Sequence, residues 1–345
     1  MALNWYGADC RLIPWAYQGA VWAQYARSRD VDLHAWTQQA GVRAGELLST
    51  RQSLALLGPL QRSAKDSAFV LGQMSLPGHY GLASQALQQG ENLIDALQLL
   101  ARYSARLSPL LTPRVLVQED DVIVYWTDAC GLSGAQRAFV VDMQMSAVTA
   151  MAQWLGHSRL PWRYSFNRTR PADVSQHASY LGTQLAFDCH LDAMRVSRVL
   201  AGRPWRGGGA ASARQMALQA LDQGADPQAE QRGILAALYD HLLPQVARNP
   251  ALDAAAQAFG VSAATLKRYL AQHGTNFQAE LDQVRVHLAL YWLGVQGQTN
   301  EFVARELGFC DVANFRRFFK RGTGQTPHAL ALGGGRFAQG AIRTG

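Results

Sequence analysis

The sequence predicts two domains of different class: an N-terminal domain of mixed α/β (α+β) type and an all-α C-terminal domain. Three observations lead to this prediction. A chain of 345 residues is too long for one ordinary domain and fits two. Glycine and proline punctuate the segment between Gly202 and Gln231, as is typical of a linker. Strand and helix signals alternate before this segment, and only helical patterns follow it.

These observations divide the chain into four segments. We expect an N-terminal domain at 1–201, a linker at 202–231 and a C-terminal domain at 232–332, followed by a flexible tail at 333–345. Within the linker, the Ala- and Gln-rich residues 212–222 are suited to a short helix.

The composition excludes several classes of protein. Hydrophobic residues make up 48% of the chain and charged residues 17%, which is enough apolar material for real cores and excludes general disorder. No stretch approaches the ~20 apolar residues of a membrane span, and no signal peptide is visible, so we expect no membrane partner. The cysteines are scattered singly, which argues against a disulfide framework and a zinc site. A cytoplasmic location is therefore expected.

In the N-terminal domain, several elements follow from local patterns. Two β-rich runs at 114–118 and 122–126 predict a hairpin. Asn92 is suited to cap a helix that extends to about residue 107, and a broad apolar face predicts a second helix over 135–155. Apolar residues at 69–76 and 163–167 are consistent with further strands.

The C-terminal domain contains one pattern twice, at residues 252–270 and 301–319. Each copy begins with a short amphipathic helix that carries Ala-x-x-x-Gly, as Ala256 with Gly260 and again as Ala304 with Gly308. The small alanine allows a second helix to cross closely, and the glycine supplies a positive φ at the turn. The next residues suited to cap a helix are Ser262 in the first copy and Asp311 in the second. The sequence therefore predicts two helix-turn-helix units.

The second helices of the two units match in their apolar and basic faces. Projection at ~100° per residue puts Leu266 and Leu270, or Phe315 and Phe319, on one face. The opposite faces carry the cations Lys267, Arg268, Arg316, Arg317 and Lys320, and Arg321 completes the basic run. Exposure to solvent explains a basic face on one of the two helices, but it does not explain why the other helix carries basic residues at equivalent positions.

A long helix predicted over 277–293, with Asn276 as its cap, joins the two units. It would fix the distance between the two basic helices. If both enter the same side of a duplex, that distance is roughly 34 Å. The net charge of +7 is consistent with an anionic partner.

At these residues the C-terminal region resembles the DNA-binding domain of the AraC/XylS family of bacterial transcription regulators. The motif runs from Ala304 through Leu307-Gly308-Phe309, Asp311 and Asn314-Phe315 to Thr326-Pro327. The resemblance covers about residues 232–332. It implies double-stranded promoter DNA as the partner, RNA polymerase as a further one, and DNA contacts by the following residues of the two second helices: Ala264, Thr265, Lys267 and Arg268 in the first, and Val312, Ala313, Asn314, Arg316 and Arg317 in the second. Asn314 has the alternative role of a local cap.

The N-terminal part resembles the regulatory domain of one branch of this family, which includes the ornithine- and arginine-responsive regulators and virulence regulators. The features are Gly81-Leu82-Ala83, then Asn92-Leu93 with Arg102-Tyr103, and Tyr180-Leu181-Gly182. This implies a module that binds a small-molecule effector or forms a homodimer, without naming the effector. The aromatic residues near the start can line a pocket or pack a core: Trp5, Tyr6, Trp15, Tyr17, Trp22 and Tyr25.

Two alternatives stay open at the level of the sequence. In the first, the N-terminal domain binds no small molecule and serves only for self-association or partner recruitment. In the second, it is an enzyme domain fused to a DNA-binding domain. The chain has no Gly-x-Ser-x-Gly, HExxH or Gly-x-x-x-x-Gly-Lys motif, so we predict no catalytic residues, metal ligands or cofactor.

Overall fold

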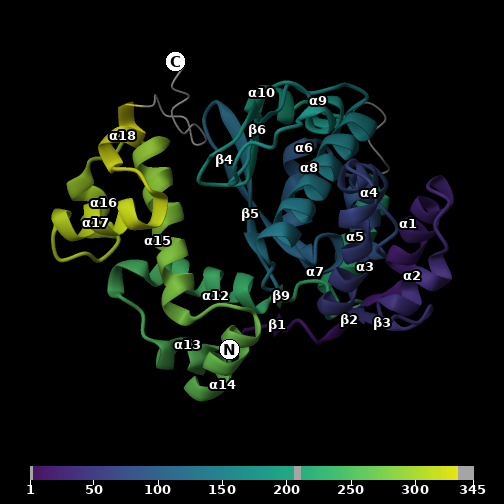
Figure 1. Ribbon diagram of the computed structural model, residues 1–345, viewed down its shortest axis with the longest axis horizontal. Helices are drawn as coiled ribbons and strands as arrows, with labels where there is room; N and C mark the ends of the chain where they lie inside the picture. Colours follow the sequence, from purple (N-terminus) through teal and green to yellow (C-terminus); the bar gives the residue numbers. More distant parts are fainter. Residues whose placement is uncertain (1–2, 206–210, 333–345) are drawn as a thin grey trace.

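The computed structural model describes residues 3–205 and 211–332, which pack around two large hydrophobic cores. Figure 1 shows the N-terminal part in purple to teal and the C-terminal part in green to yellow. The predicted tail at 333–345 lies outside the described residues, as does the 206–210 portion of the predicted linker.

A five-stranded sheet in the order β4-β5-β8-β6-β7 organises the N-terminal domain. Its strands are β4 (Leu111–Val117), β5 (Asp121–Asp128), β6 (Arg163–Ser165), β7 (Leu185–Ala186) and β8 (Ala193–Ser197). The predicted hairpin is confirmed as β4 and β5, with Val117 paired to Val122 beside the turn. The sequence did not predict β8, which pairs antiparallel with both β5 and β6.

Strand β5 is buried on both faces because each face meets a different part of the molecule. Val122, Val124 and Trp126 enter the main N-terminal core, whereas Ile123 and Tyr125 point to the opposite face. Helices α4, α6 and α8 lie on the core side of β4 and β5, and the C-terminal domain lies on the other side (Figure 1).

The remaining elements of the N-terminal domain are mostly helices. They are α1 (Trp15–Ser28), α2 (Leu33–Gln39), α3 (Thr50–Ser63), α4 (Ser67–Ser75), α5 (Leu82–Gln88), α6 (Leu93–Arg102), α7 (Ser104–Leu107), α8 (Gly134–Gly156), α9 (Ser175–Leu181) and α10 (Arg198–Ala201), with the short pair β2 (Arg11–Pro14) and β3 (Leu47–Ser49). Helix α8 confirms the helix predicted over 135–155.

Two predictions in this domain are wrong. Helix α4 spans Ser67–Ser75, so the run predicted at 69–76 is helical and not a strand, and it packs against α8 with Phe69 and Leu71 buried. Gly72 permits this contact, since a Cβ there would lie 2.2 Å from the carbonyl oxygen of Met143. The helix predicted from Asn92 to residue 107 is capped by Asn92 but interrupted at Tyr103, which separates α6 from α7.

The predicted linker is not a free connection where the structure describes it. Helix α11 (Ala211–Asp222) forms as expected, and its Ala217 and Leu221 are buried in the N-terminal core. Arg214 pairs with Asp95 on α6, and Arg106 pairs with Asp226 at 2.6 Å. The segment is therefore held on the N-terminal domain by both apolar packing and ion pairs.

The C-terminal domain is helical apart from the two-residue strand β9 (Arg232–Gly233). Its helices are α12 (Ile234–Leu242), the 3-10 helix η1 (Leu243–Arg248), α13 (Leu252–Ala258), α14 (Ala263–Gln272), α15 (Phe277–Gly294), α16 (Asn300–Glu306), α17 (Val312–Thr323) and α18 (Pro327–Leu332). Strand β9 pairs in parallel with β1 (Trp5–Tyr6), so the start of the chain joins the start of this domain.

Candidate nucleic-acid interface

Helices α13 and α14 form the first helix-turn-helix unit. Ala256 is buried at the crossing of the two helices, and Gly260 turns the chain with φ of 68°. The predicted cap is confirmed, since Ser262 Oγ accepts a hydrogen bond from the backbone N–H of Thr265 at 3.1 Å. These local features fix where α14 begins.

Helices α16 and α17 repeat this arrangement in the second unit. Ala304 is buried, and Gly308 has φ of 74°. The cap of α17 is confirmed as Asp311, whose Oδ1 accepts from the backbone N–H of Asn314 at 2.6 Å. A carboxylate at this position also interacts favourably with the positive end of the helix dipole.

Both second helices bury one face and expose the other. Leu266 and Leu270 of α14 are buried, as are Phe315, Phe318 and Phe319 of α17. The structure leaves Ala264 and Ala313 exposed, with Thr265, Val312 and Asn314 half-buried at the starts of the helices. All six predicted cations are exposed: Lys267, Arg268, Arg316, Arg317, Lys320 and Arg321.

Most of these cations are not neutralised within the protein. Among the residues that the structure describes, Lys267, Arg316 and Lys320 form no ion pair with an acidic side chain. Arg321 differs, because its Nη2 lies 3.8 Å from Oδ2 of Asp282 on α15. The exposed face of α17 therefore carries net positive charge available to an anionic partner.

Asn314 takes part in the local cap. Its Nδ2 donates to Asp311 Oδ2 at 2.8 Å, and its Oδ1 accepts from Arg317 Nη2 at 2.5 Å. The chain Asp311–Asn314–Arg317 thus orients the Arg317 guanidinium along the start of the helix.

Helix α15 places the two units at its opposite ends, with α13 and α14 beside its start and α16 and α17 beside its end (Figure 1). The predicted cap Asn276 is confirmed, since its Oδ1 accepts from the N–H of Ala279 at 3.0 Å. Leu281 and Val284 are buried in the common core, so the helix is fixed to both units.

The start of the chain holds the first unit, a contact that the sequence analysis missed. The indole of Trp5 packs against the rings of Phe259 and Tyr269 at 5.6 and 5.4 Å, and its Nε1 donates to the Phe259 carbonyl at 3.3 Å. The backbone N–H of Ala8 donates to Nε2 of His273, which directly follows α14. The early aromatic residues were a signal, but no local pattern shows that Trp5 packs on the C-terminal core while Trp22 and Tyr25 pack in the N-terminal one.

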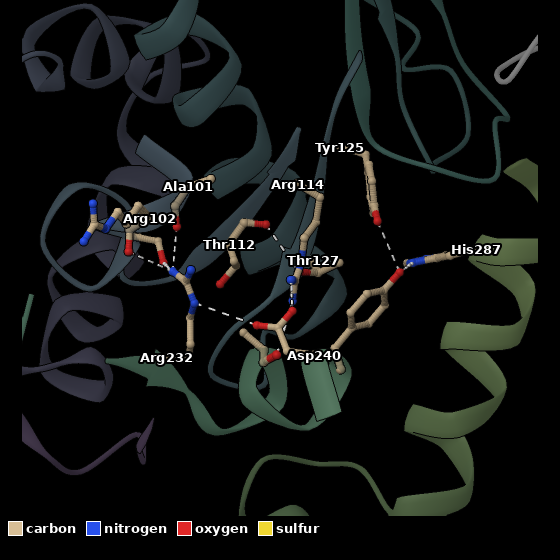
Figure 2. A network of polar contacts seen from close by, with 12 residues as sticks. Ala101, Arg102, Thr112, Arg114, Tyr125, Thr127, Arg232, Asp240 and His287 are labelled. Atoms are coloured by element: carbon tan, nitrogen blue, oxygen red, sulfur yellow. Dashed lines mark hydrogen bonds and ion pairs between the residues drawn. The ribbon is translucent and has the colours of Figure 1, made fainter. Parts of the chain in front are cut away.

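Figure 2 shows a polar network that links the sheet to the C-terminal domain. Asp240 of α12 accepts from Arg114 Nη1 of β4, and its other oxygen lies 3.8 Å from Arg232 Nε. Arg232 in turn donates to the Ala101 carbonyl at 2.6 Å. Both arginines are more than two-thirds buried, so this bridge is less screened by water than a surface ion pair.

A second branch of the network reaches α15. The hydroxyl of Tyr125 on β5 lies 3.3 Å from that of Tyr239 on α12, which lies 3.1 Å from His287 Nδ1 (Figure 2). Burial lowers the pKa of His287 to about 3, and the nearby charges of Arg137 and Arg114 act in the same direction. A neutral imidazole thus connects the sheet to the helix that carries both units.

Glu280 makes the free energy of unfolding depend on pH in a way that can be tested. It is 8% exposed, accepts from Thr275 Oγ1 at 2.7 Å, and has its pKa raised to about 7, first by burial and also by the charge of Asp128. The folded protein binds the Glu280 proton more tightly than the unfolded chain does. Protonated Glu280 therefore stabilises the fold at low pH, and this stabilisation is lost as the pH rises to about 7, its pKa in the folded protein. We expect Glu280→Gln to match the parent near pH 4 and to exceed it by about 3 kcal/mol at pH 8.

Chemical unfolding of parent and variant from pH 4 to pH 8 measures this difference. Glu301→Gln is the control, because that carboxylate is exposed on α16. A difference between parent and Glu280→Gln that does not change with pH would contradict the assignment.

The described ranges 3–205 and 211–332 contain no helix that is long and apolar enough to cross a membrane, and no group of three or more His, Cys, Asp or Glu side chains placed to hold a metal ion. The arrangement of two capped helix-turn-helix units with exposed cations instead defines a DNA-binding protein of the double helix-turn-helix class.

Comparison with known families gives the particular class. Residues 31–205 match the model "Arabinose-binding domain of AraC transcription regulator, N-term", and residues 255–331 match a helix-turn-helix domain. The chain belongs to the AraC family of transcription regulators. It is a DNA-binding transcription regulator, and the resemblance found in the sequence is confirmed.

Several known proteins are similar to this chain. An ornithine utilization regulator of Pseudomonas aeruginosa is 27% identical over 328 residues, which cover 92% of this chain and 95% of the relative. An HTH-type transcriptional regulator of Mycobacterium tuberculosis is 24% identical over 257 residues, covering 72% of this chain and 73% of the relative. The crystal structure of the regulator CdpR from P. aeruginosa aligns with a TM-score of 0.46 and 22% identity, over 92% of this chain and 98% of that one.

Proposed function

We propose that the chain reads promoter DNA with α14 and α17, which enter two successive segments of the major groove. The observation that carries this proposal is the paired geometry: both helices are capped, bury an apolar face and expose cations on the other. Helix α15 has 18 residues and is roughly 27 Å long, of the same order as the roughly 34 Å rise of one turn of DNA. A spacer of this length suits two reading helices on one side of a duplex.

The exposed residues divide into two roles. Arg316 and Arg317 are the candidates for bidentate contacts to guanine, whereas the short Ala264, Val312 and Ala313 fit thymine methyl groups. Contacts to phosphate and to flanking base edges fall to the other predicted residues, Thr265, Lys267, Arg268, Asn314, Lys320 and Arg321. The turns that position them depend on Ala256, Gly260, Ala304 and Gly308.

The N-terminal domain supplies the regulation. A small-molecule effector bound there changes the contacts of Trp5 and Arg114 with the C-terminal domain, and hence how the units are presented to DNA. We also propose self-association through this domain. The regulator acts on RNA polymerase at promoters in the cytoplasm and has no enzymatic activity of its own.

Binding of the full-length chain to DNA upstream of its own and neighbouring genes tests this function. We expect sequence-selective binding that weakens steeply with salt, because phosphate contacts release counterions. The measurement is fluorescence anisotropy across a salt series with an excess of competitor DNA. Binding that never exceeds that of the competitor at any upstream sequence would overturn the proposal.

A further inference from the structure

The N-terminal domain contains a cavity of about 50 Å³ lined by residues of α1, α3, α4, α7 and α8. Most of its wall is apolar, with Val21, Leu57, Leu71, Leu107, Leu110 and Met143 among the lining residues. Within the described part of the chain, no charged side chain lines it. A charged ligand buried here would have no counter-charge, and the energetic penalty of its desolvation would be large.

Three lining side chains have buried polar atoms without a hydrogen-bond partner. They are Trp22 Nε1, Ser53 Oγ and Gln144 Oε1, on residues that are 6%, 2% and 5% exposed. Buried polar groups are nearly always paired, so three such atoms around one cavity are unusual. Their presence on three lining residues distinguishes this cavity from a purely apolar packing defect.

The three atoms form a complementary set. The indole N–H of Trp22 only donates, the carbonyl oxygen of Gln144 only accepts, and the hydroxyl of Ser53 does either. A neutral carboxamide matches this set, because its oxygen accepts from Trp22 and Ser53 while its N–H donates to Gln144. The apolar wall then contacts a short hydrocarbon portion.

We infer that this cavity is the effector site and that it takes a small uncharged ligand with an amide-like head and an apolar tail. A water molecule needs about 10–15 Å³ of such space, so the cavity of about 50 Å³ holds roughly three to five water-sized groups, and covalently bonded atoms lie closer together than separate waters. Free ornithine, with its charged ammonium and carboxylate groups, does not fit this chemistry, although a relative is named for ornithine utilization. The inference rests on the proposed role of the N-terminal domain as a sensor.

The cavity is in contact with the elements that hold the C-terminal domain. Pro109 lines it, and its carbonyl accepts a hydrogen bond from the hydroxyl of Tyr6 at 3.0 Å. Tyr6 belongs to β1, which pairs with Gly233 at the start of α12. Leu110, another lining residue, directly precedes β4 with its interface residue Arg114. A ligand that shifts Pro109 and Leu110 therefore acts on both of these contacts, through Tyr6 and through Arg114.

Thermal unfolding of the full-length chain with isobutyramide or isobutyrate tests the inference. The two probes have nearly the same shape and differ in charge. We expect isobutyramide to raise the melting temperature by on the order of 3 °C at ten times its dissociation constant, and isobutyrate to leave it unchanged. The variant Gln144→Leu removes the unpaired acceptor, so it should melt at or above the parent temperature and lose the response to isobutyramide.

Either of two results would overturn the inference: equal responses to the two probes, or no response to isobutyramide in the parent. A response that Gln144→Leu retains would also place the ligand elsewhere. Ser53→Ala is a second variant that keeps the test informative if Gln144→Leu fails to fold. The thermal unfolding is measured without DNA. A missing response to isobutyramide therefore argues against the ligand site alone, whereas missing selective binding in the anisotropy measurement argues against the proposed function.

Discussion

Gly308→Ala is expected to disable the second helix-turn-helix unit, whereas Gly324→Ala leaves it folded. Both glycines have left-handed backbone, with φ of 74° and 73°, so an alanine at either position costs roughly 1–2 kcal/mol of strain. They differ in their surroundings. A Cβ on Gly308 would lie 2.6 Å from the carbonyl oxygen of Ala247, but one on Gly324 would meet nothing within 4 Å.

The added contact at Gly308 is with backbone, which cannot move aside as a flexible side chain does. Ala247 lies in η1, and the neighbouring Asn249 donates its side-chain N–H to the Gly308 carbonyl at 3.1 Å. We therefore expect a further loss of roughly 1–3 kcal/mol in Gly308→Ala, as in overpacked cores. Its selective DNA binding should disappear, because α16 is no longer held against η1 and α17 loses its position on α15.

Chemical unfolding of the two variants measures the difference, and anisotropy with operator DNA reports the function. Because Gly308 and Gly324 have nearly the same left-handed backbone, the cost of that conformation is common to both alanine variants and cancels in the comparison. If both variants lose the same stability, the close approach to Ala247 is not what fixes this turn.

The C-terminal domain was predictable because its signals are local. Gly260 and Gly308 mark the turns, Ser262 and Asp311 mark the helix starts, and a repeated apolar pattern gives the buried faces. Each of these features lies within a few residues of the structure that it determines. The structure retains all of them, and the family comparison supports the same class of domain.

The N-terminal domain depends on contacts between distant segments, so its topology did not follow from the sequence. Strand β8 lies between β5 and β6, which come from two separate parts of the chain. The apolar run at 69–76 carries no period that separates a buried strand from a buried helix, and only its packing against α8 decides. For the same reason, neither the bridge from Arg114 to Asp240 nor the cavity lined by Trp22, Ser53 and Gln144 was visible beforehand.

Arg317→Ala and Arg321→Ala should weaken DNA binding in different ways. Arg317 lies on the exposed face of α17, and Asn314 orients its guanidinium towards the N-terminal half of the helix, which contacts base edges in such units. Arg321 lies one turn further along, is 76% exposed, and leans towards Asp282 of α15. The first position suits the reading of a base, and the second suits a phosphate.

We expect Arg317→Ala to cost about 1–3 kcal/mol on the preferred operator and much less on an operator changed at one base pair, because a bidentate contact is specific to one base. Arg321→Ala should weaken binding to all sequences similarly and reduce the slope of log K against log salt by about 1. Arg43→Ala, far along the chain in the N-terminal domain, removes the same charge and serves as the control. Anisotropy titrations on single-base operator variants at several salt concentrations separate the two patterns. A uniform loss in both variants would refute the division of roles, since base readout requires that the loss depend on sequence.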